Sequence, residues 1–486
     1  MNISINPNYC IRNEKYCSYI LYAGNLIHAK AEPGPLVMPI PPYLGMILSS
    51  FNGGDYEETI NKCSSIIEIE PDKIKLITEQ LINNEEPFIS KIGDEKIFIP
   101  RNFLIESTRN SKVFTEADFS ALDQFKPHRM LMPAYITIMI TSKCHTNCIY
   151  CYADRSRPDD MQLETILALI EQAHEEGVVN VMVSGGDIFA NKDWRIILKK
   201  LADYNYHPIL STKVPLKKDD IEFLISIGVE EIQYSVDTLN PESATKHFRI
   251  NGDKYIEKIR EMLQASDELG LPFNVKSVVT KWNGSLKNFQ EMFAQFSTFK
   301  NLRSWNVVPA FCSSFRDDYE TYKPLHDTLV ELDEYFKNLK ANFVLYTSKL
   351  IEKAQKQVKF STVEEYASKN KTCGANTYTM GVLSNGKVTV CEMLYYNTMF
   401  YLGDAGSERL RDIWNSKKAI SLFEYKVKVE NSDSACYSCK VLEKCKKSMK
   451  KRYCLVDVIN SYGEKKWDYP DPRCPEGPDC DIEKIM

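Results

Sequence analysis

Three features are scarce in this sequence: a targeting segment, a long apolar run and an excess of positive charge. The opening stretch "MNISINPNYCIRNEKYCSYI" has no basic segment followed by an apolar one, and no uninterrupted apolar run approaches the roughly 18 residues of a membrane span. The net charge of -5 over 486 residues argues against broad electrostatic attraction to nucleic acid or to an anionic membrane. We therefore expect a cytoplasmic protein that binds neither.

Cysteine, in contrast, is abundant, with 15 residues in a chain expected to occupy a compartment where disulfides are rare. Three lie together in "TSKCHTNCIYCYADRSR", namely Cys144, Cys148 and Cys151. A second group lies toward the C-terminus and comprises Cys373, Cys391, Cys436, Cys439, Cys445, Cys454, Cys474 and Cys480. The remaining four, Cys10, Cys17, Cys63 and Cys312, are scattered, and we expect them to be small buried apolar side chains.

Short β-branched runs alternate with amphipathic segments between residues 135 and 308. The six runs are "YITIMI", "VVNVMV", "HPIL", "EEIQYSV", "FNVKSVV" and "SWNVV". Helix-like stretches between them include 162–176, 218–228 and 253–270, the last with Gly270 at a C-cap position. Strands that alternate with helices predict a parallel α/β sheet that closes into a partial or full barrel. The cysteine triplet directly follows the first strand, at the edge where such sheets carry their active groups.

Residues 1 to about 110 have a different pattern. Residues 17–31 indicate a β-hairpin, 41–53 and 71–89 indicate helices, and 87–100 indicate a second hairpin that turns at Gly93-Asp94. Helices followed by a hairpin are typical of a winged-helix-like domain. A DNA-binding module is disfavoured because this region has ten Lys and Arg against fourteen Asp and Glu. The polar stretch 106–130 reads as a linker to the barrel.

The spacing C-x3-C-x2-C of the triplet suits one face of a four-iron, four-sulfur cluster and leaves one iron without a protein ligand. Such an open iron can bind a cofactor. Zinc is the competing interpretation, but a structural zinc site normally closes with four ligands. His145 could be the fourth ligand in principle, although its adjacency to Cys144 disfavours a tetrahedral arrangement.

The triplet, with aromatic Tyr150 before its third cysteine and its place after the first strand, resembles the signature of the radical S-adenosylmethionine (radical SAM) superfamily. The resemblance covers most of residues 130–310. It implies that the open iron binds the amino and carboxylate groups of S-adenosylmethionine. It also implies that an electron from a flavodoxin or ferredoxin-type donor cleaves this cofactor to a 5'-deoxyadenosyl radical, which abstracts a substrate hydrogen.

Further residues match that family. "VSGGD" follows the second strand where relatives carry Gly-Gly-Glu, so Gly185, Gly186 and Asp187 are expected to contact the methionine amino group, with a shorter acid than usual. By the same resemblance, Ser211 and Ser235 are candidates for the ribose and Arg249 for the methionine carboxylate. Lys213 in "LSTKV" departs from a frequent Thr-Asn-Gly stretch, and ordinary capping or surface pairing is the alternative for the two serines and Arg249.

The C-terminal cysteines show a second pattern. Cys373 to Cys391 reads C-x12-G-x4-C, and Cys436 to Cys445 reads C-x2-C-x5-C. A hairpin is expected to turn at Asn385-Gly386 as a type I' turn and to present Cys391 on its returning strand. Eight cysteines are enough to ligate two complete four-iron clusters, although zinc ribbons use similar pairs.

This region resembles the SPASM domain, an auxiliary-cluster extension of radical enzymes that modify peptides and proteins, and residues 402–423 carry the Leu-x-x-Ile-Trp stretch of such domains. The spacing from Cys445 to Cys454 departs from the family pattern. By analogy, Cys373, Cys391 and Cys454 belong to the nearer auxiliary cluster and Cys436, Cys439 and Cys445 to the farther one, with Cys474 and Cys480 in an open order. With the triplet, the resemblance implies three 4Fe-4S clusters in all.

The N-terminal region then resembles the peptide-recognition domain of maturases of ribosomally made peptides, which binds a leader peptide as an added strand. A docking or dimerisation module is the alternative. The expected domains are 1–110, a winged-helix-like leader-recognition domain; 111–130, a linker; 131–325, a partial (β/α)6 radical SAM barrel; 326–370, a bridging helical segment; and 371–486, a cysteine-rich SPASM domain.

The resulting prediction is a peptide maturase that installs a crosslink, most simply a thioether, in a precursor peptide. Alternatives within the enzyme class are carbon-carbon or ether crosslinking, a sulfatase-maturase-like enzyme, and an enzyme of quinone-cofactor biosynthesis. The alternative from another class is a metal-stabilised binding protein without catalysis, in which the cysteine groups hold zinc.

Overall fold

The structure is a computed structural model of the whole chain. It describes all residues except 27–33, 94, 116–121, 123, 152, 154–159, 313–317, 348–349, 351–358, 370–372, 396, 425–432, 443–444, 446–453 and 481–486. The chain forms two compact units. Unit 1 comprises Met1–Ile136, Glu171–Met182 and Tyr206–Pro208, and unit 2 comprises Thr137–Ile170, Val183–Asn205 and Ile209–Met486.

The N-terminal part of unit 1 is built on two sheets. One has the order β4-β3-β2-β9, with β2 (Tyr9–Glu14), β3 (Cys17–Tyr22), β4 (Val37–Ile40) and β9 (Val113–Thr115). The other has the order β5-β1-β8, with β1 (Asn2–Ile5), β5 (Asn52–Asp55) and β8 (Leu104–Glu106). Of the hairpin predicted over 17–31, residues 17–22 form β3, which pairs antiparallel with β2 and with β4, and residues 27–31 lie outside the described residues. Strand β9 lies inside the stretch expected to be a linker.

Helices and a β-hairpin complete this region. α1 (Pro42–Ser49) and α3 (Pro71–Thr78) fall in the two predicted helices, and β6 (Phe88–Ile92) pairs with β7 (Glu95–Ile99) around Gly93 as expected. Asp94 lies outside the described residues. α2 (Tyr56–Ile67) was not predicted, although the Asp55 carboxylate caps it by accepting from Glu58 N at 3.1 Å. Cys10, Cys17 and Cys63 are buried as expected, whereas Cys312 is only half-buried.

Arg12 on β2 links this sheet to the rest of unit 1. Its side chain is fully buried, and its guanidinium donates to the carbonyl oxygens of Met132 and Gly177, each at 2.5 Å. Gly177 has a left-handed φ of 70° just after α4 (Leu163–Glu175). The guanidinium therefore ties β2 to the segment before β10 and to the turn that follows α4.

Five of the six barrel strands overlap the predicted runs, whereas the third begins at Ser211, just after the run predicted at 207–210. The six strands are β10 (Tyr135–Thr141), β11 (Asn180–Gly185), β12 (Ser211–Thr212), β13 (Ile232–Ser235), β14 (Phe273–Val279) and β15 (Leu302–Pro309). β12 to β15 pair in parallel, and β16 (Val344–Tyr346), which was not expected, adds to β15. β10 and β11 lie in another sheet of order β11-β10-β17-β18-β19.

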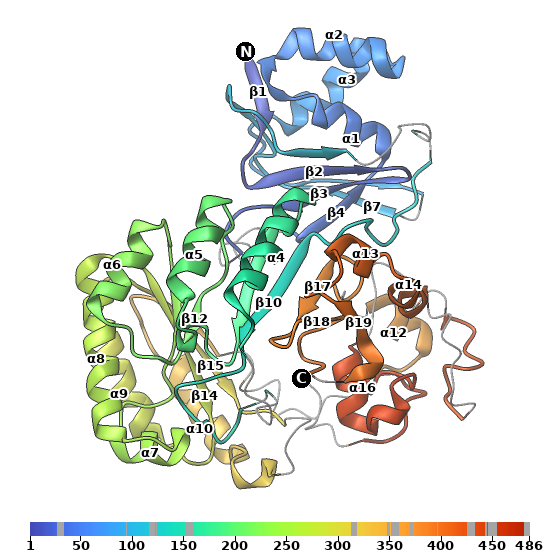
Figure 1. The fold of residues 1–486 in the computed structure, drawn as a ribbon. Helices are drawn as coiled ribbons and strands as arrows, with labels where there is room; N and C mark the ends of the chain where they lie inside the picture. The colour runs from blue at the N-terminus through green and yellow to red at the C-terminus, as the bar shows by residue number, and fades with distance from the viewer. Residues whose placement is uncertain are drawn as a thin grey trace. The chain divides into compact units, whose positions relative to one another are not determined.

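Helices connect these strands and cover the outer side of the sheet (Figure 1). They are α5 (Trp194–Asp203), α6 (Lys218–Ser226), α7 (Pro241–Phe248), α8 (Gly252–Leu269), α9 (Leu286–Phe296) and α10 (His326–Lys337). α8 ends at Gly270, whose φ is 76°, as its sequence predicted. Among the described residues, none of the helices has the length and apolarity to cross a bilayer.

The C-terminal part of unit 2 begins with α12 (Val363–Lys369) and the strands β17 (Thr379–Val382), β18 (Lys387–Thr389) and β19 (Tyr401–Asp404). The hairpin between β17 and β18 was predicted, but its turn is not type I'. Gly386 has a φ of 79°, Asn385 is not left-handed, and Gly386 N donates to Leu383 O at 2.9 Å. This pattern is a three-residue loop with a bulge at glycine. Helices α13 (Leu410–Trp414), α14 (Lys417–Glu424) and α16 (Leu455–Tyr462) follow.

Candidate functional site

The loop after β10 brings the cysteine triplet to the carboxyl edge of the barrel strands. Cys148 is buried, whereas Cys144 and Cys151 are half-buried. Two backbone bonds attach this loop to the end of α7, from Asn147 N to Phe248 O at 2.9 Å and from Ile149 N to His247 O at 3.0 Å. The loop conformation is therefore fixed by protein contacts. Burial raises the pKa of the Cys148 thiol, and the charge of Lys213 acts in the opposite direction.

The glycine pair after β11 packs against the start of the cysteine loop. A Cβ at Gly185 would lie 1.9 Å from Thr141 O, and one at Gly186 would lie 2.1 Å from Lys143 O. Gly186 N donates to Thr141 O at 2.9 Å, and Asp187 N donates to Lys143 O at 2.8 Å. The absence of side chains thus allows two backbones to meet. Contact of these glycines with S-adenosylmethionine stays a prediction.

Asp187 accepts hydrogen bonds from the segment that follows β12. Its buried carboxylate accepts from Thr212 Oγ1 at 2.9 and 2.8 Å, from Lys213 N at 2.8 Å and from Val214 N at 3.3 Å. Burial raises the pKa of Asp187, and these hydrogen bonds oppose that shift. The carboxylate therefore orders residues 212–214, and its predicted contact with a methionine amino group is not tested.

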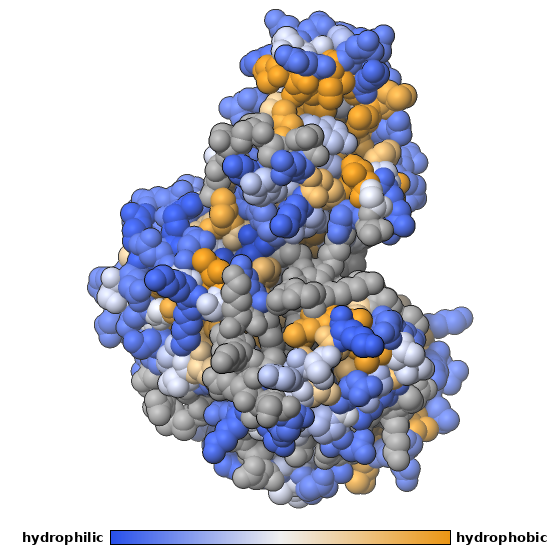
Figure 2. All heavy atoms as spheres, turned by 90° about the vertical axis from the view of Figure 1, so that its right-hand side faces the viewer, coloured by the Kyte–Doolittle hydropathy of each residue, from blue (hydrophilic) through white to orange (hydrophobic). Residues whose placement is uncertain are grey.

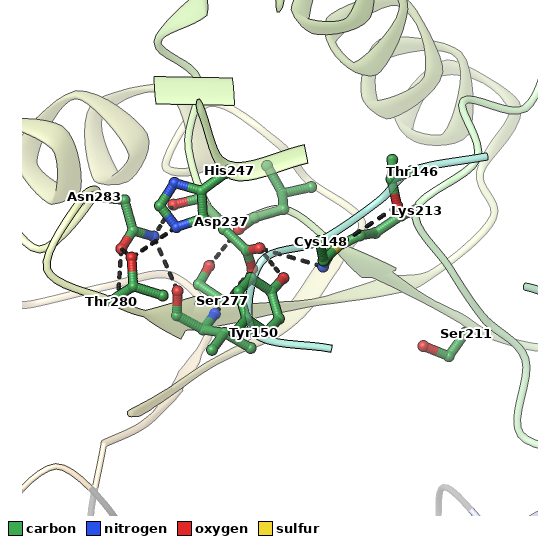
Figure 3. Close-up of polar contacts among 12 residues, drawn as sticks. Thr146, Cys148, Tyr150, Ser211, Lys213, Asp237, His247, Ser277, Thr280 and Asn283 are labelled. Atoms are coloured by element: carbon green, nitrogen blue, oxygen red, sulfur yellow. Dashed lines mark hydrogen bonds and ion pairs between the residues drawn. The ribbon is translucent and has the colours of Figure 1, made fainter. Parts of the chain in front are cut away.

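Tyr150, between Cys148 and Cys151, forms part of a buried polar network (Figure 3). Its hydroxyl donates to Asp237 Oδ2, which also lies 3.3 Å from Lys213 Nζ, while Val278 N donates to Asp237 Oδ1 at 2.9 Å. Burial raises the pKa of Tyr150 well above its usual value, and the Asp237 carboxylate raises it further. The sequence interpretation missed Asp237 and the role of Lys213.

A second set of polar side chains supports this network from the loop after β14. Asn283 Nδ2 donates to Asp237 O at 2.8 Å and to Val278 O at 2.9 Å, and Asn283 Oδ1 accepts from Thr280 N at 2.8 Å. Thr280 Oγ1 lies 2.7 Å from His247 Nε2. These residues also escaped the sequence interpretation. Their signal was available, because Thr280 directly follows β14 and Asp237 lies two residues past β13, at the edge where active groups gather.

The three remaining cofactor candidates lie in different settings. Ser211 on β12 is exposed, accepts from Gln233 Nε2 at 2.7 Å and lies apart from the buried network in Figure 3. Ser235 ends β13 and is half-buried beside its register partner Lys276. Arg249 is exposed at the C-cap of α7 with a φ of 52°. The ribose and carboxylate contacts of these residues stay predictions.

Three C-terminal thiols line one pocket in unit 2. Its volume is about 50 Å³, and its lining includes Cys373, Cys391 and Cys454 with the aromatic rings of Phe400 and Trp467. Burial raises the pKa of Cys454 to about 12 and that of Cys391 well above its usual value, and the neighbouring thiols add to both shifts. These are the cysteines predicted to hold the nearer auxiliary cluster.

Other C-terminal thiols gather elsewhere in the same unit. Cys445 and Cys474 belong to one small buried cluster with Tyr366 and Ala367. Burial raises the pKa of Cys474 to about 11, and the nearby charges of Cys436 and Cys439 raise it further. Cys474 therefore lies near cysteines assigned to the farther cluster. Burial raises the pKa of Tyr462, and the nearby charge of Cys480 raises it further.

The donor set fits iron–sulfur clusters, because thiolate sulfur is their usual protein ligand. In the described part of the chain, no three His, Cys, Asp or Glu side chains already form a closed set of metal ligands. The assignment of individual cysteines to clusters therefore stays a prediction.

Two family models match the two cysteine-containing regions of this chain. Residues 138–289 match the family model of the radical SAM superfamily, and residues 373–440 match that of the SPASM iron-sulfur cluster-binding domain. The first match contains the triplet, the glycine pair and Lys213; the second contains Cys373, Cys391, Cys436 and Cys439.

Two solved structures share the fold. The crystal structure of Streptococcus suis SuiB bound to S-adenosylmethionine has a TM-score of 0.63 at 18% identity and covers 97% of this chain and 100% of that chain. SuiB bound to precursor peptide SuiA gives a TM-score of 0.61 at 18% identity, with 97% and 100% covered.

Among curated proteins, the GTP 3',8-cyclase of Aliarcobacter butzleri is 25% identical over 154 residues, which are 30% of this chain and 47% of that protein. The chain spans about half the length of the curated relatives it matches. These findings establish the fold class predicted from the sequence. The chain is an enzyme of the radical SAM class, with a radical SAM domain followed by a SPASM iron–sulfur cluster-binding domain.

Proposed function

We propose that this protein is a cytoplasmic peptide maturase that installs a crosslink, most simply a thioether, in a ribosomally made precursor peptide. The observation that carries the proposal is the coexistence of the fixed cysteine loop after β10 with two separate groups of C-terminal thiols. A cluster held by three cysteines keeps one iron open, and fully ligated clusters serve electron transfer. When bound, the first cluster and S-adenosylmethionine supply a radical that removes a substrate hydrogen.

The protein groups position and shield this chemistry. The bonds from Asn147 and Ile149 to α7 hold the cysteine loop, and Gly185 and Gly186 let the next loop pack against it. The burial of Cys148 and of Asp237 keeps water from one side of the site. Such exclusion of water strengthens electrostatic interactions and protects reactive species.

A peptide substrate is supported by the N-terminal domain. β6 has β7 as its one described neighbour, so its other edge is available for an added strand. Exposed apolar side chains lie on β6 and on the two helices that precede it in the chain. Ile89 on β6 is 54% exposed, Leu76 on α3 is 66% exposed and Ile66 on α2 is 56% exposed. Figure 2 shows apolar side chains gathered over this end of the chain. SuiB, which shares the fold, is known bound to a precursor peptide.

An oxidative crosslink suits the auxiliary thiol groups. Forming a carbon–sulfur bond from a C–H and an S–H group removes one hydrogen atom, one proton and one electron. With the cofactors bound, the hydrogen atom would go to the radical that S-adenosylmethionine supplies, the proton to solvent and the electron to an iron–sulfur cluster held by the C-terminal cysteines. The product is therefore lighter by two hydrogens per ring, whereas epimerisation returns a hydrogen atom and leaves the mass unchanged.

The decisive experiment replaces Cys144, Cys148 and Cys151 with Ala. After anaerobic reconstitution with a flavodoxin or ferredoxin-type donor, we expect the wild type to form 5'-deoxyadenosine and the variant to form none. Mass spectrometry of a precursor peptide encoded beside this gene should show the loss of two hydrogens per ring. Undiminished cofactor cleavage in the variant contradicts the assignment, and an unchanged mass with inverted stereocentres indicates epimerisation instead.

A further inference from the structure

A buried ion pair lies directly behind the cysteine loop. Lys213 Nζ is 3.3 Å from Asp237 Oδ2, and the two side chains are only 13% and 0% exposed. Lysine is rarely buried to this extent, because removing its charge from water is costly unless an opposite charge compensates it. Lys213 is therefore not an ordinary solvent-exposed lysine, and its charge is compensated inside the protein.

The backbone around Lys213 fixes the direction of its side chain. Lys213 N donates to Asp187 Oδ2 at 2.8 Å, and Lys213 O accepts from Tyr255 OH at 3.0 Å. Both partners are buried side chains. The buried carboxylate of Asp187 thus serves to hold the segment that carries this lysine.

The ammonium faces the cysteine loop. Its Nζ lies 5.5 Å from the centre of the Tyr150 ring and 5.6 Å from that of Phe248, within range of a cation–π interaction. The carboxylate of Asp237 receives both this ammonium and the Tyr150 hydroxyl, as Figure 3 shows. One carboxylate therefore ties the lysine to a residue that lies between two predicted cluster ligands.

We infer that Lys213 is a positioning residue that holds a positive charge over the Tyr150 ring of the cysteine loop, with Asp237 fixing both this ammonium and Tyr150. The inference rests on the proposed cluster at Cys144, Cys148 and Cys151. One-electron reduction by the protein donor adds negative charge to a thiolate-bound cluster. A nearby ammonium therefore favours the reduced form and raises the reduction potential, and a carboxylate lowers it.

The test compares Lys213→Met, Lys213→Arg and Asp237→Asn with the wild type, and Lys218→Met, an exposed lysine on α6, is the control. The measurement is the midpoint potential of the electron paramagnetic resonance signal that changes shape when S-adenosylmethionine is added. We expect a lower potential in Lys213→Met, a near-native one in Lys213→Arg, a higher one in Asp237→Asn and no shift in Lys218→Met.

Iron per chain is measured on the same samples. A purely structural role would lower the iron content and leave the potential of the remaining cluster unchanged, and that result overturns the inference. Shifts of the same sign in Lys213→Met and Asp237→Asn overturn it too. If Lys213→Met retains no cluster, the other two variants decide. A higher potential in Asp237→Asn together with a native potential in Lys213→Arg supports the inference, and any other result overturns it. A wild type without any cofactor-responsive signal would instead refute the proposed function.

Discussion

At the residue scale, the absence of side chains at glycine positions determines how closely the backbone after β11 can pack against the cysteine loop. Gly186→Ala would place a Cβ 2.1 Å from Lys143 O, a backbone atom that cannot move aside cheaply. We expect a loss of about 2 kcal/mol in the free energy of unfolding, typical of overpacking, together with a lower iron content per chain. Gly54→Ala is the matched control, because its Cβ would meet Thr59 Oγ1 only at 3.7 Å. Denaturant unfolding and iron analysis compare the two, and equal effects would contradict the close-approach role of Gly186.

His247 makes the stability of this region depend on pH. Burial lowers its pKa, and the Asp237 carboxylate only partly opposes this. The unfolded chain therefore takes up a proton near pH 6.5 that the folded protein does not, so the stabilising contribution is complete above that pH and is lost as pH falls below it. One such group gives a slope of up to about 1.4 kcal/mol per pH unit. We expect His247→Gln to reduce the loss of stability between pH 7.5 and 5.5 in denaturant unfolding, and parallel pH profiles would refute this.

At the scale of elements, a half-buried arginine, Arg473, joins α16 to the segment that carries Cys474. Arg473 Nη2 donates to Asp457 Oδ2 at 2.6 Å and Nη1 to Asp471 Oδ1 at 3.2 Å, and these carboxylates are 3% and 1% exposed. Removing one member of a buried ion pair costs about 3–5 kcal/mol. For Arg473→Met we expect amide exchange in α16 to accelerate by roughly 100-fold or more. Lys287→Met, which breaks an exposed pair with Glu291 on α9, should leave exchange nearly unchanged.

The elements that the sequence predicted correctly are those with a strong periodic or turn signal. Five of the six barrel strands, α8 with its glycine cap and the hairpin at Gly93 belong to this class, whereas β12 begins just after the run predicted for it. α2 was missed although Tyr56, Ile60 and Cys63 recur at helical spacing on its buried face, whereas strand β9 was missed because a three-residue strand depends on its partner β2. In the site, cysteine spacing indicated the cluster loop, but the pairing of Lys213 with Asp237 joins residues 24 positions apart and no local pattern encodes it.

At the scale of the whole molecule, the cysteines predicted to bind clusters include three separate groups. The loop after β10, the pocket lined by Cys373, Cys391 and Cys454, and the cluster around Cys445 and Cys474 involve separate sets of thiols. Three four-iron clusters require about 12 iron per chain, so the triplet-to-Ala variant should retain about 8. Iron and acid-labile sulfide analysis decides this, and retention of only about 4 iron would mean a single auxiliary cluster.

Under the proposed function, recognition of the precursor would depend on the N-terminal domain. Deleting residues 1–110 would be an ambiguous test, because it would also remove Arg12 and its bonds to Met132 and Gly177 within unit 1. A change on β6, at the edge that has no strand beside it in the described part of the chain, is a sharper test. Ile89→Glu places a charge on an exposed apolar side chain, and a peptide added as a strand would lose contact with it.

We expect Ile89→Glu to lower kcat/KM for the full precursor by roughly tenfold, about 1.4 kcal/mol of binding, mainly through KM. The formation of 5'-deoxyadenosine without peptide should stay unchanged, because the cysteine loop is intact. Ile196→Glu on α5 is the matched control, since Ile196 is similarly exposed at 50% in the barrel. The same comparison with a precursor lacking its leader should show no difference between the two variants. Equal effects of both substitutions on the full precursor, or a loss that persists without the leader, would place leader recognition elsewhere than on β6.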